Sequence, residues 1–333
     1  MNKKGFEIQF NWLFVLVAGT AIILFFTVVV IKQKNVSETS TKATVLKSME
    51  VIITGASVST DTTNIIDIPN SDIEVDCSRV SIGGVSKQYQ NLVLFAPSLI
   101  KGNRLITQTL AFSVPYRATN LLYITSPQLR YIIIGDSRLA KDVNKSIPSE
   151  LKKEFYQTAP EIKNLNNYKI RFVFFENIID FPKTLEKMPD YDVTAIKING
   201  DNEKGTIEFL QKKGTSWLSK GTSFYIGKQS LIGAIYADTF DMYECNMRNV
   251  FSRLNLVTKI YAERTKKLTQ EAIVSGRQFQ CNQFYSNALN QLNSISAASS
   301  NFNKENIDVI ADSAKSLSSE NKNAQIYSCT LIY

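Results

Sequence analysis

The chain contains no histidine. Histidine is the side chain most often used as a general base near neutral pH, and it is also the commonest metal ligand. An enzyme built from this sequence would therefore depend on carboxylate, lysine, tyrosine or cysteine chemistry. The absence argues against most hydrolases and metalloenzymes, and we expect neither a cofactor nor a metal ion.

Several ligand-binding motifs are absent as well. No GxGxxG sequence is present, and the segment 221–228 (GTSFYIGK) has one residue too many between its glycines for a phosphate-binding loop. The four cysteines lack CxxC spacing, which argues against a zinc site. The net charge is +8, but no block of five basic residues occurs. We therefore expect scattered, solvated basic residues and no nucleic-acid partner.

One long apolar run lies near the N-terminus, after a short tail of residues 1–11. Residues 12–31 (WLFVLVAGTAIILFFTVVVI) carry no charge, and at a helical rise of ~1.5 Å these 20 residues span about 30 Å, the thickness of a hydrocarbon core. Trp12 suits the headgroup level at one edge, and two lysines follow the other edge. The run is longer than a signal-peptide core and has no small-residue cleavage site. We expect a transmembrane helix whose partner is the lipid bilayer.

The orientation of this helix is indicated by conflicting signals. Two lysines precede the apolar run and four follow it closely, which favours a cytoplasmic C-terminal domain, but large domains cross membranes largely regardless of such charges. Two Asn-x-Ser sequons, at Asn35 and Asn144, and the four cysteines favour the cell exterior. We expect a cytoplasmic N-terminus and an external domain in the cell envelope, with both asparagines as glycosylation candidates.

Residues 32–58 predict a stalk or linker. The polar segment 35–44 (NVSETSTKAT) suits either a short spacer or a continued helical stalk. The apolar residues Val45, Leu46, Met49, Ile52 and Ile53 then follow at helical spacing. They predict a short amphipathic helix that docks on the folded domain.

Residues 59–237 predict an α/β domain. Apolar strands that alternate with helices are typical of a parallel sheet with covering helices, and the last three expected strands suit antiparallel additions. The expected strands are 72–78, 91–96, 104–114, 131–134, 170–175, 193–198, 206–210, 223–226 and 231–236, with helices near 137–146 and 184–188.

Residues 238–333 predict a helical region with a terminal strand. Asp238 and Asn303 are expected helix N-caps, and apolar stripes at helical spacing lie within 247–261, 281–295 and 307–317. The tail 326–333 (IYSCTLIY) suits a strand. The predicted fold class is α/β, with an N-terminal transmembrane helix, a mixed sheet with covering helices, and a C-terminal helical hairpin or three-helix cap.

The cysteines predict two disulfides, Cys77–Cys245 and Cys281–Cys329. In a helical hairpin that turns near Gly276, Cys245 and Cys281 lie at levels that differ by roughly 39 Å, far beyond disulfide reach. A third helix would return to the level of Cys281 shortly before Cys329. Cys245 points away from its helix's apolar stripe, towards elements that include the strand bearing Cys77.

The sequence Gly135-Asp136-Ser137, between an expected strand and helix, resembles the first block of the SGNH or GDSL-type hydrolases and acyltransferases. The resemblance implies a nucleophilic Ser137 beside helix N–H groups that can stabilise an oxyanion. That family activates the serine with a histidine, which this chain lacks. The competing prediction is that Asp136 or Ser137 caps the helix, and we expect Ser137→Ala to leave the biological role intact.

Two further resemblances concern the N-terminus. The stretch FEIQFNWLFVLVAG is similar to the N-termini of uncharacterised single-span membrane proteins of small-genome archaea, which implies no activity. Lys3-Lys4-Gly5-Phe6 resembles a prepilin peptidase site, although Phe10 stands where that family has a glutamate.

Together these features predict a membrane-anchored, non-enzymatic surface protein. Its external α/β domain would bind an envelope protein or polymer, or contribute to an envelope structure. The alternatives are an SGNH-like envelope acyl-group enzyme or its inactive relative, and a pilin-like assembly subunit.

Overall fold

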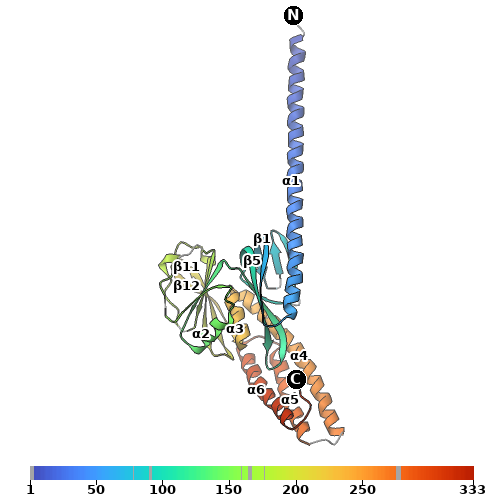
Figure 1. Ribbon diagram of the computed structural model, residues 1–333, viewed down its shortest axis with the longest axis vertical. Coiled ribbons are helices and arrows are strands. Elements are labelled where there is room, and N and C mark those ends of the chain that lie inside the picture. The colour runs from blue at the N-terminus through green and yellow to red at the C-terminus, as the bar shows by residue number, and fades with distance from the viewer. Residues whose placement is uncertain are drawn as a thin grey trace.

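The computed structural model describes residues 4–77, 79–89, 92–158, 160–163, 167–175, 177–274 and 279–333. The chain is a mixed α/β protein with a long N-terminal helix, two six-stranded sheets and a helical C-terminal part (Figure 1). The predicted fold class is confirmed. The strands, however, are divided between two sheets, here called sheet A and sheet B.

Helix α1 (Lys4–Val58) is continuous over 55 residues, and its N-terminal part projects away from the rest of the molecule (Figure 1). Its segment Trp12–Lys34 is long and apolar enough to cross a membrane, and none of it is buried in the protein. Its C-terminal part contacts sheet A and buries Val45, Leu46 and Met49. Residues 35–44 therefore form the continued helical stalk, and the predicted docking helix is the end of α1.

Sheet A has the strand order β3-β2-β1-β5-β6-β4. All neighbouring strands pair antiparallel except β4 and β6, which are parallel. Its strands are β1 (Thr62–Asp76), β2 (Arg79–Ile82), β3 (Val85–Gln88), β4 (Val93–Phe95), β5 (Leu99–Ser113) and β6 (Arg117–Thr125).

Sheet B has the strand order β12-β11-β10-β9-β7-β8. Strands β8, β7, β9 and β10 are parallel, and β10, β11 and β12 are antiparallel. The sequence predicts this arrangement for β7, β9, β10, β11 and β12, but it does not predict β8. Its strands are β7 (Leu129–Ile134), β8 (Lys152–Tyr156), β9 (Lys169–Phe174), β10 (Val193–Gly200), β11 (Lys204–Lys213) and β12 (Ser216–Ile226). Helix α2 (Arg138–Ser146) connects β7 to β8, whereas the helix expected near 184–188 is reduced to the 3-10 turn η1 (Lys183–Leu185), which is followed by η2 (Asp190–Asp192).

The strand expected at 231–236 is wrong, because these residues belong to helix α3 (Gly227–Tyr236). A short apolar run does not distinguish a buried strand from a buried helix by periodicity. Helix α3 contacts strands of both sheets, so residues 230–236 are buried on every side of the helix. A Cβ at Gly233 would lie 3.0 Å from the ring of Phe95, so a glycine lets the helix approach β4.

Three helices form the C-terminal part: α4 (Phe240–Val274), α5 (Phe279–Ala298) and α6 (Lys304–Ile326). Helix α5 packs between α4 and α6, and the bundle extends away from the α1 stalk (Figure 1). This is the predicted three-helix cap, and Asn303 caps α6 as expected by accepting from the amide of Asn306 at 2.9 Å.

The strand expected at 326–333 is wrong. The tail bonds to the helices instead of to a sheet: the amide of Cys329 donates to the Ala324 carbonyl at 2.8 Å, and the amide of Ile332 donates to Asn321 Oδ1 at 2.8 Å. These bonds satisfy its backbone without a strand partner.

Two disulfides join segments that are distant in sequence. Cys77, which follows β1, is bonded to Cys245 in α4, and Cys281 in α5 is bonded to Cys329 in the tail; their Cα–Cα distances are 5.9 and 5.8 Å. Both pairs are the ones predicted from the sequence. The first ties sheet A to the helical bundle, and the second ties the C-terminal tail to α5.

Candidate functional site

The Gly135-Asp136-Ser137 turn follows β7 and begins α2. Ser137 Oγ accepts a hydrogen bond from the amide of Ala140 at 3.2 Å, so Ser137 is the N-cap of α2. Asp136 is exposed and pairs with Lys141 at 2.7 Å. Among the described residues, no lysine or carboxylate contacts the Ser137 hydroxyl. The capping prediction is confirmed, and the described part of the chain places no base beside this serine to activate it.

The glycosylation candidates both lie in helices. Asn35 is in α1, and its side chain lies outside the described residues. Asn144 is in the last turn of α2 and is half-buried, and its backbone carbonyl accepts from Lys153 Nζ at 2.6 Å. Glycosylation at either asparagine stays a prediction.

A buried charged cluster lies where α3 turns into α4, at residues that no expected functional motif contains. Strand β9 carries Lys169 and Arg171 two residues apart, so both side chains lie on the same face of sheet B. That face is turned towards the end of α3. Lys169, Arg171 and Asp238 have relative exposures of 3%, 2% and 6%. We call the connection between α3 and α4, residues 237–239, the elbow.

Asp238 is the acidic member of this cluster. Its Oδ1 accepts from the amide of Ser98 and its Oδ2 from the Ser98 hydroxyl, both at 2.8 Å, and it also forms an ion pair with Lys169. The prediction that Asp238 caps α4 is therefore wrong. Thr239 takes that role, accepting from the amide of Met242 at 3.3 Å, because Asp238 turns inward to neutralise a buried lysine.

Arg171 is fully buried, and it binds the C-terminal end of α3. Its Nη2 donates to the carbonyls of Ala234 and Ala237 at 2.8 and 2.6 Å, and its Nη1 contacts the carbonyl of Asp238 at 3.4 Å. These carbonyls have no partner within the helix, so a guanidinium is suited to bind them. Burial lowers the pKa of Arg171 to about 10 while the charge of Asp238 acts in the opposite direction, so the side chain stays cationic at neutral pH.

A cavity of about 260 Å³ lies beside this cluster, between β10, β11, β12 and the start of α4. We call it the elbow cavity. Ser98 and Asp238 reach one side of it, and Thr194 of β10 lines it next to Gln211 of β11. Thr194 is only 4% exposed, and its hydroxyl has no hydrogen-bond partner in the described part of the chain. Such an unpaired buried hydroxyl is uncommon and calls for an explanation.

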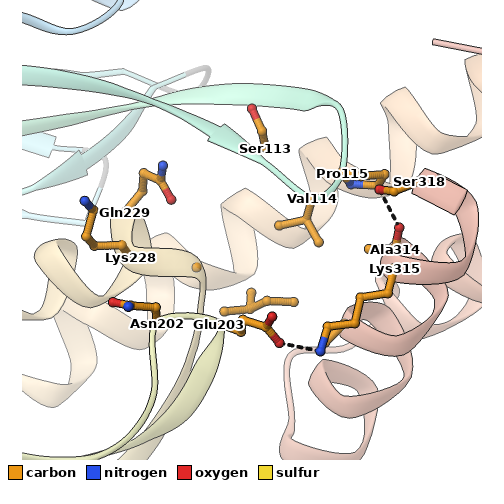
Figure 2. Close-up of a pocket in the computed structure, with 13 residues that line it drawn as sticks. Ser113, Val114, Pro115, Asn202, Glu203, Lys228, Gln229, Ala314, Lys315 and Ser318 are labelled. Atoms are coloured by element: carbon orange, nitrogen blue, oxygen red, sulfur yellow. Dashed lines mark hydrogen bonds and ion pairs between the residues drawn. The ribbon is translucent and has the colours of Figure 1, made fainter. Parts of the chain in front are cut away.

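A second cavity, of about 380 Å³, lies where the two sheets meet α6 (Figure 2). We call it the junction cavity. The β5–β6 turn, the β10–β11 turn, the start of α3 and one face of α6 line it. Val114, Ile226 and Ala314 provide apolar surface. At its edge Glu203 pairs with Lys315 at 2.5 Å, so these two charges already satisfy each other (Figure 2).

Metal binding has no structural support in the described residues, where no group of three or more histidine, cysteine, aspartate or glutamate side chains is placed to hold an ion. One sequence signal could have indicated the charged cluster. Lys169 and Arg171 interrupt the apolar strand 169–174 with the period of two that places side chains on one face, and a buried face requires partners for them.

Comparisons of the chain with protein-family models, with curated proteins and with solved structures found no match.

Proposed function

We propose that this is a single-span membrane protein whose external α/β domain binds a partner in the cell envelope without acting as an enzyme. The observation that carries the proposal is the continuity of α1. One helix contains the unburied apolar segment Trp12–Lys34 and then buries Val45, Leu46 and Met49 against sheet A. An apolar segment of this length with no cover inside the protein is suited to a bilayer.

The same continuity supports a fixed position of the domain relative to the membrane. The 10 residues from 35 to 44 are helical and add ~15 Å between the end of the apolar segment and the first buried contact at Val45. Lys87 of β3 pairs with Glu50 of α1, and Asn120 of β6 donates to the Ser59 carbonyl at 3.2 Å, so the stalk is held on both sides. The domain would be presented close to the bilayer at a defined angle and would not swing on a flexible linker.

The disulfides support an external location. Both bonds join segments far apart in sequence, with separations of 168 and 48 residues. Such bonds persist in oxidising compartments and are rare in a reducing cytosol.

Orientation can be tested by cysteine labelling in intact cells. All four native cysteines are in disulfides, so an introduced cysteine would be the reactive one. We expect a membrane-impermeant maleimide to label Val51→Cys, whose parent side chain is 70% exposed above the apolar segment, and not Lys4→Cys. After lysis both variants should be labelled. Labelling of Lys4→Cys alone in intact cells would overturn the proposed orientation.

The non-enzymatic part of the proposal is tested at Ser137. Because its hydroxyl caps α2 and has no base beside it, we expect Ser137→Ala to cost about 1 kcal/mol of stability and to leave the biological role intact. Ser137→Asp, which also caps helices well, should restore the stability. Loss of the role in both variants at normal abundance would favour the SGNH-like alternative instead.

A further inference from the structure

The elbow cavity has uncommitted polar groups among its lining residues. Four of its lining side chains form no hydrogen bond or ion pair with any other described residue: Tyr191, Gln211, Lys220 and Asp241. Thr194 adds the buried hydroxyl that lacks a partner. The set includes hydrogen-bond donors and acceptors that converge on one cavity, which is the arrangement that orients a polar ligand.

The charges around this cavity balance. Lys220 and Asp241 carry opposite charges, and Asp238 is neutralised by Lys169 behind it. Arg171 is buried, and its Nη2 donates to backbone carbonyls. A strongly anionic ligand would meet the like charge of Asp241, and a strongly cationic ligand would meet the like charge of Lys220. The balance therefore favours a neutral ligand.

Aromatic rings form one wall of the same cavity. Phe240 and Phe209 meet edge to face at 6.0 Å between ring centroids, and both line the cavity together with Tyr191. Phe240 packs directly on Gly221, where an added Cβ would lie 2.8 Å from the ring, so the backbone of β12 fixes its position. An aromatic face has a negative quadrupole and attracts weakly positive C–H groups.

We propose that the elbow cavity binds a neutral sugar unit of an envelope polysaccharide, an inference that rests on the proposed external location. A sugar ring presents C–H groups to an aromatic wall, and its hydroxyls both donate and accept hydrogen bonds. It carries no net charge, as the balanced lining requires. The volume of about 260 Å³ equals on the order of eight water molecules, enough for one ring inserted from the end or branch of a chain.

The test uses the full chain in lipid nanodiscs, which avoids detergents that contain sugars. Saturation-transfer NMR is recorded with glucose, galactose, mannose and N-acetylglucosamine, and with glucuronate and glucosamine as charged counterparts. We expect transfer to at least one neutral sugar, with a dissociation constant on the order of 1 mM for a single unit. Thr194→Val and Gln211→Met should each weaken binding about fivefold or more by removing a hydrogen bond.

A matched control separates binding from folding. Thr107 is a buried threonine in β5 of sheet A, and Thr107→Val should leave sugar binding unchanged. Because the Thr194 hydroxyl has no partner among the described residues, Thr194→Val should not lower the melting temperature, which a purely structural role would lower. The inference would be overturned by no transfer to any neutral sugar, by binding in both cavity variants that is as tight as in the unchanged chain, or by a preference for charged sugars.

The two proposals fail separately. The sugar test uses purified protein, so its failure would leave the labelling result and the external location intact. Labelling that reverses the orientation, with sugar binding retained, would overturn the proposed function and keep the cavity as a sugar site.

Discussion

Helices α1 and α3 are both rich in apolar residues, yet their surroundings are opposite. In α1 the segment Trp12–Lys34 is unburied, whereas residues 230–236 of α3 are covered by strands of both sheets. Length accounts for the difference. The 10 residues of α3 span ~15 Å and fit between two sheets, whereas the 23 residues of the α1 segment span ~35 Å, which is enough to cross a bilayer's hydrocarbon core. An apolar helix needs either a protein layer or a bilayer.

The largest expected effect concerns the membrane insertion of the apolar segment of α1. Ile22 and Phe26 lie one turn apart near the middle of the apolar segment, and replacing both by lysine should cost about 6 kcal/mol of membrane insertion. We expect the double variant to leave the membrane fraction on carbonate extraction. The melting temperature of the folded domain should not change, because neither side chain is buried in it.

The control for this variant is Val51→Lys in the same helix beyond the apolar segment, where the side chain is 70% exposed. It should remain in the membrane fraction. If the double lysine variant stayed fully in the membrane fraction, the assignment of this segment to the bilayer would be contradicted.

The next largest effect concerns the buried ion pair between Asp238 and Lys169 beside the end of α3. Asp238→Asn leaves Lys169 buried without a counter-ion, and we expect a loss of about 3–5 kcal/mol in the free energy of unfolding. Denaturant unfolding monitored by fluorescence measures it. Asp308→Asn is the matched control, since Asp308 pairs with Lys204 on the surface and water can replace the partner. Its loss should be about 0–1 kcal/mol, and equal losses at both sites would show that burial does not set the strength of the elbow pair.

A smaller effect compares glycines in the two helices. Gly233→Leu in α3 should cost about 1–3 kcal/mol of stability, because the new side chain collides with the ring of Phe95. Gly19→Leu in α1 has nothing within 4 Å of the added Cβ and should not change the thermal stability of the domain. Thermal unfolding of both variants measures these two changes in stability. A stable Gly233→Leu protein would mean that α3 is packed more loosely than its contacts indicate.

The smallest effect concerns an ion pair at the edge of sheet B, where water reaches one partner. Arg130 is buried and donates from Nε and Nη2 to both carboxylate oxygens of Glu154 at 2.7 Å, which lowers the pKa of Glu154. Because the folded pKa is lowered, the stabilisation is present above the ordinary glutamate pKa and is lost as the pH falls through the lowered value.

This pH dependence gives a defined measurement. The stability difference between the unchanged chain and Glu154→Gln should be on the order of 1 kcal/mol at neutral pH. This stability difference should shrink when the unfolding of both proteins is measured at acidic pH. A difference that is independent of pH would show that packing, and not the charge of Glu154, stabilises this edge.

The sequence predicted the elements whose patterns are long or strongly periodic. The apolar segment, the three C-terminal helices and strands β7, β9 and β10 of sheet B lie where their patterns place them, whereas the parallel edge strand β8 was not expected. The two disulfides also followed from the sequence, because helix rise and hairpin geometry restrict which cysteines can meet.

The candidate site was less predictable. Ser98 precedes β5, Thr194 lies in β10 and Asp238 lies in the elbow, so only the folded chain brings these three residues to one cavity. Nothing in the chain near Thr194 indicates that its hydroxyl would lack a partner. Asp238 was expected to cap α4 because a local pattern does not show that a lysine lies buried nearby.

The sequence by itself determined that one segment is apolar over a bilayer's thickness, that the chain is α/β, and which cysteines pair. These properties depend on composition, period and distance along the chain. Only the tertiary structure decided that residues 231–236 are a helix, that Lys169 and Arg171 are buried, and that a cavity opens at the elbow. Each of these depends on which surfaces pack around a segment, because burial changes the free energy of an apolar helix or an ion pair far more than local propensity does.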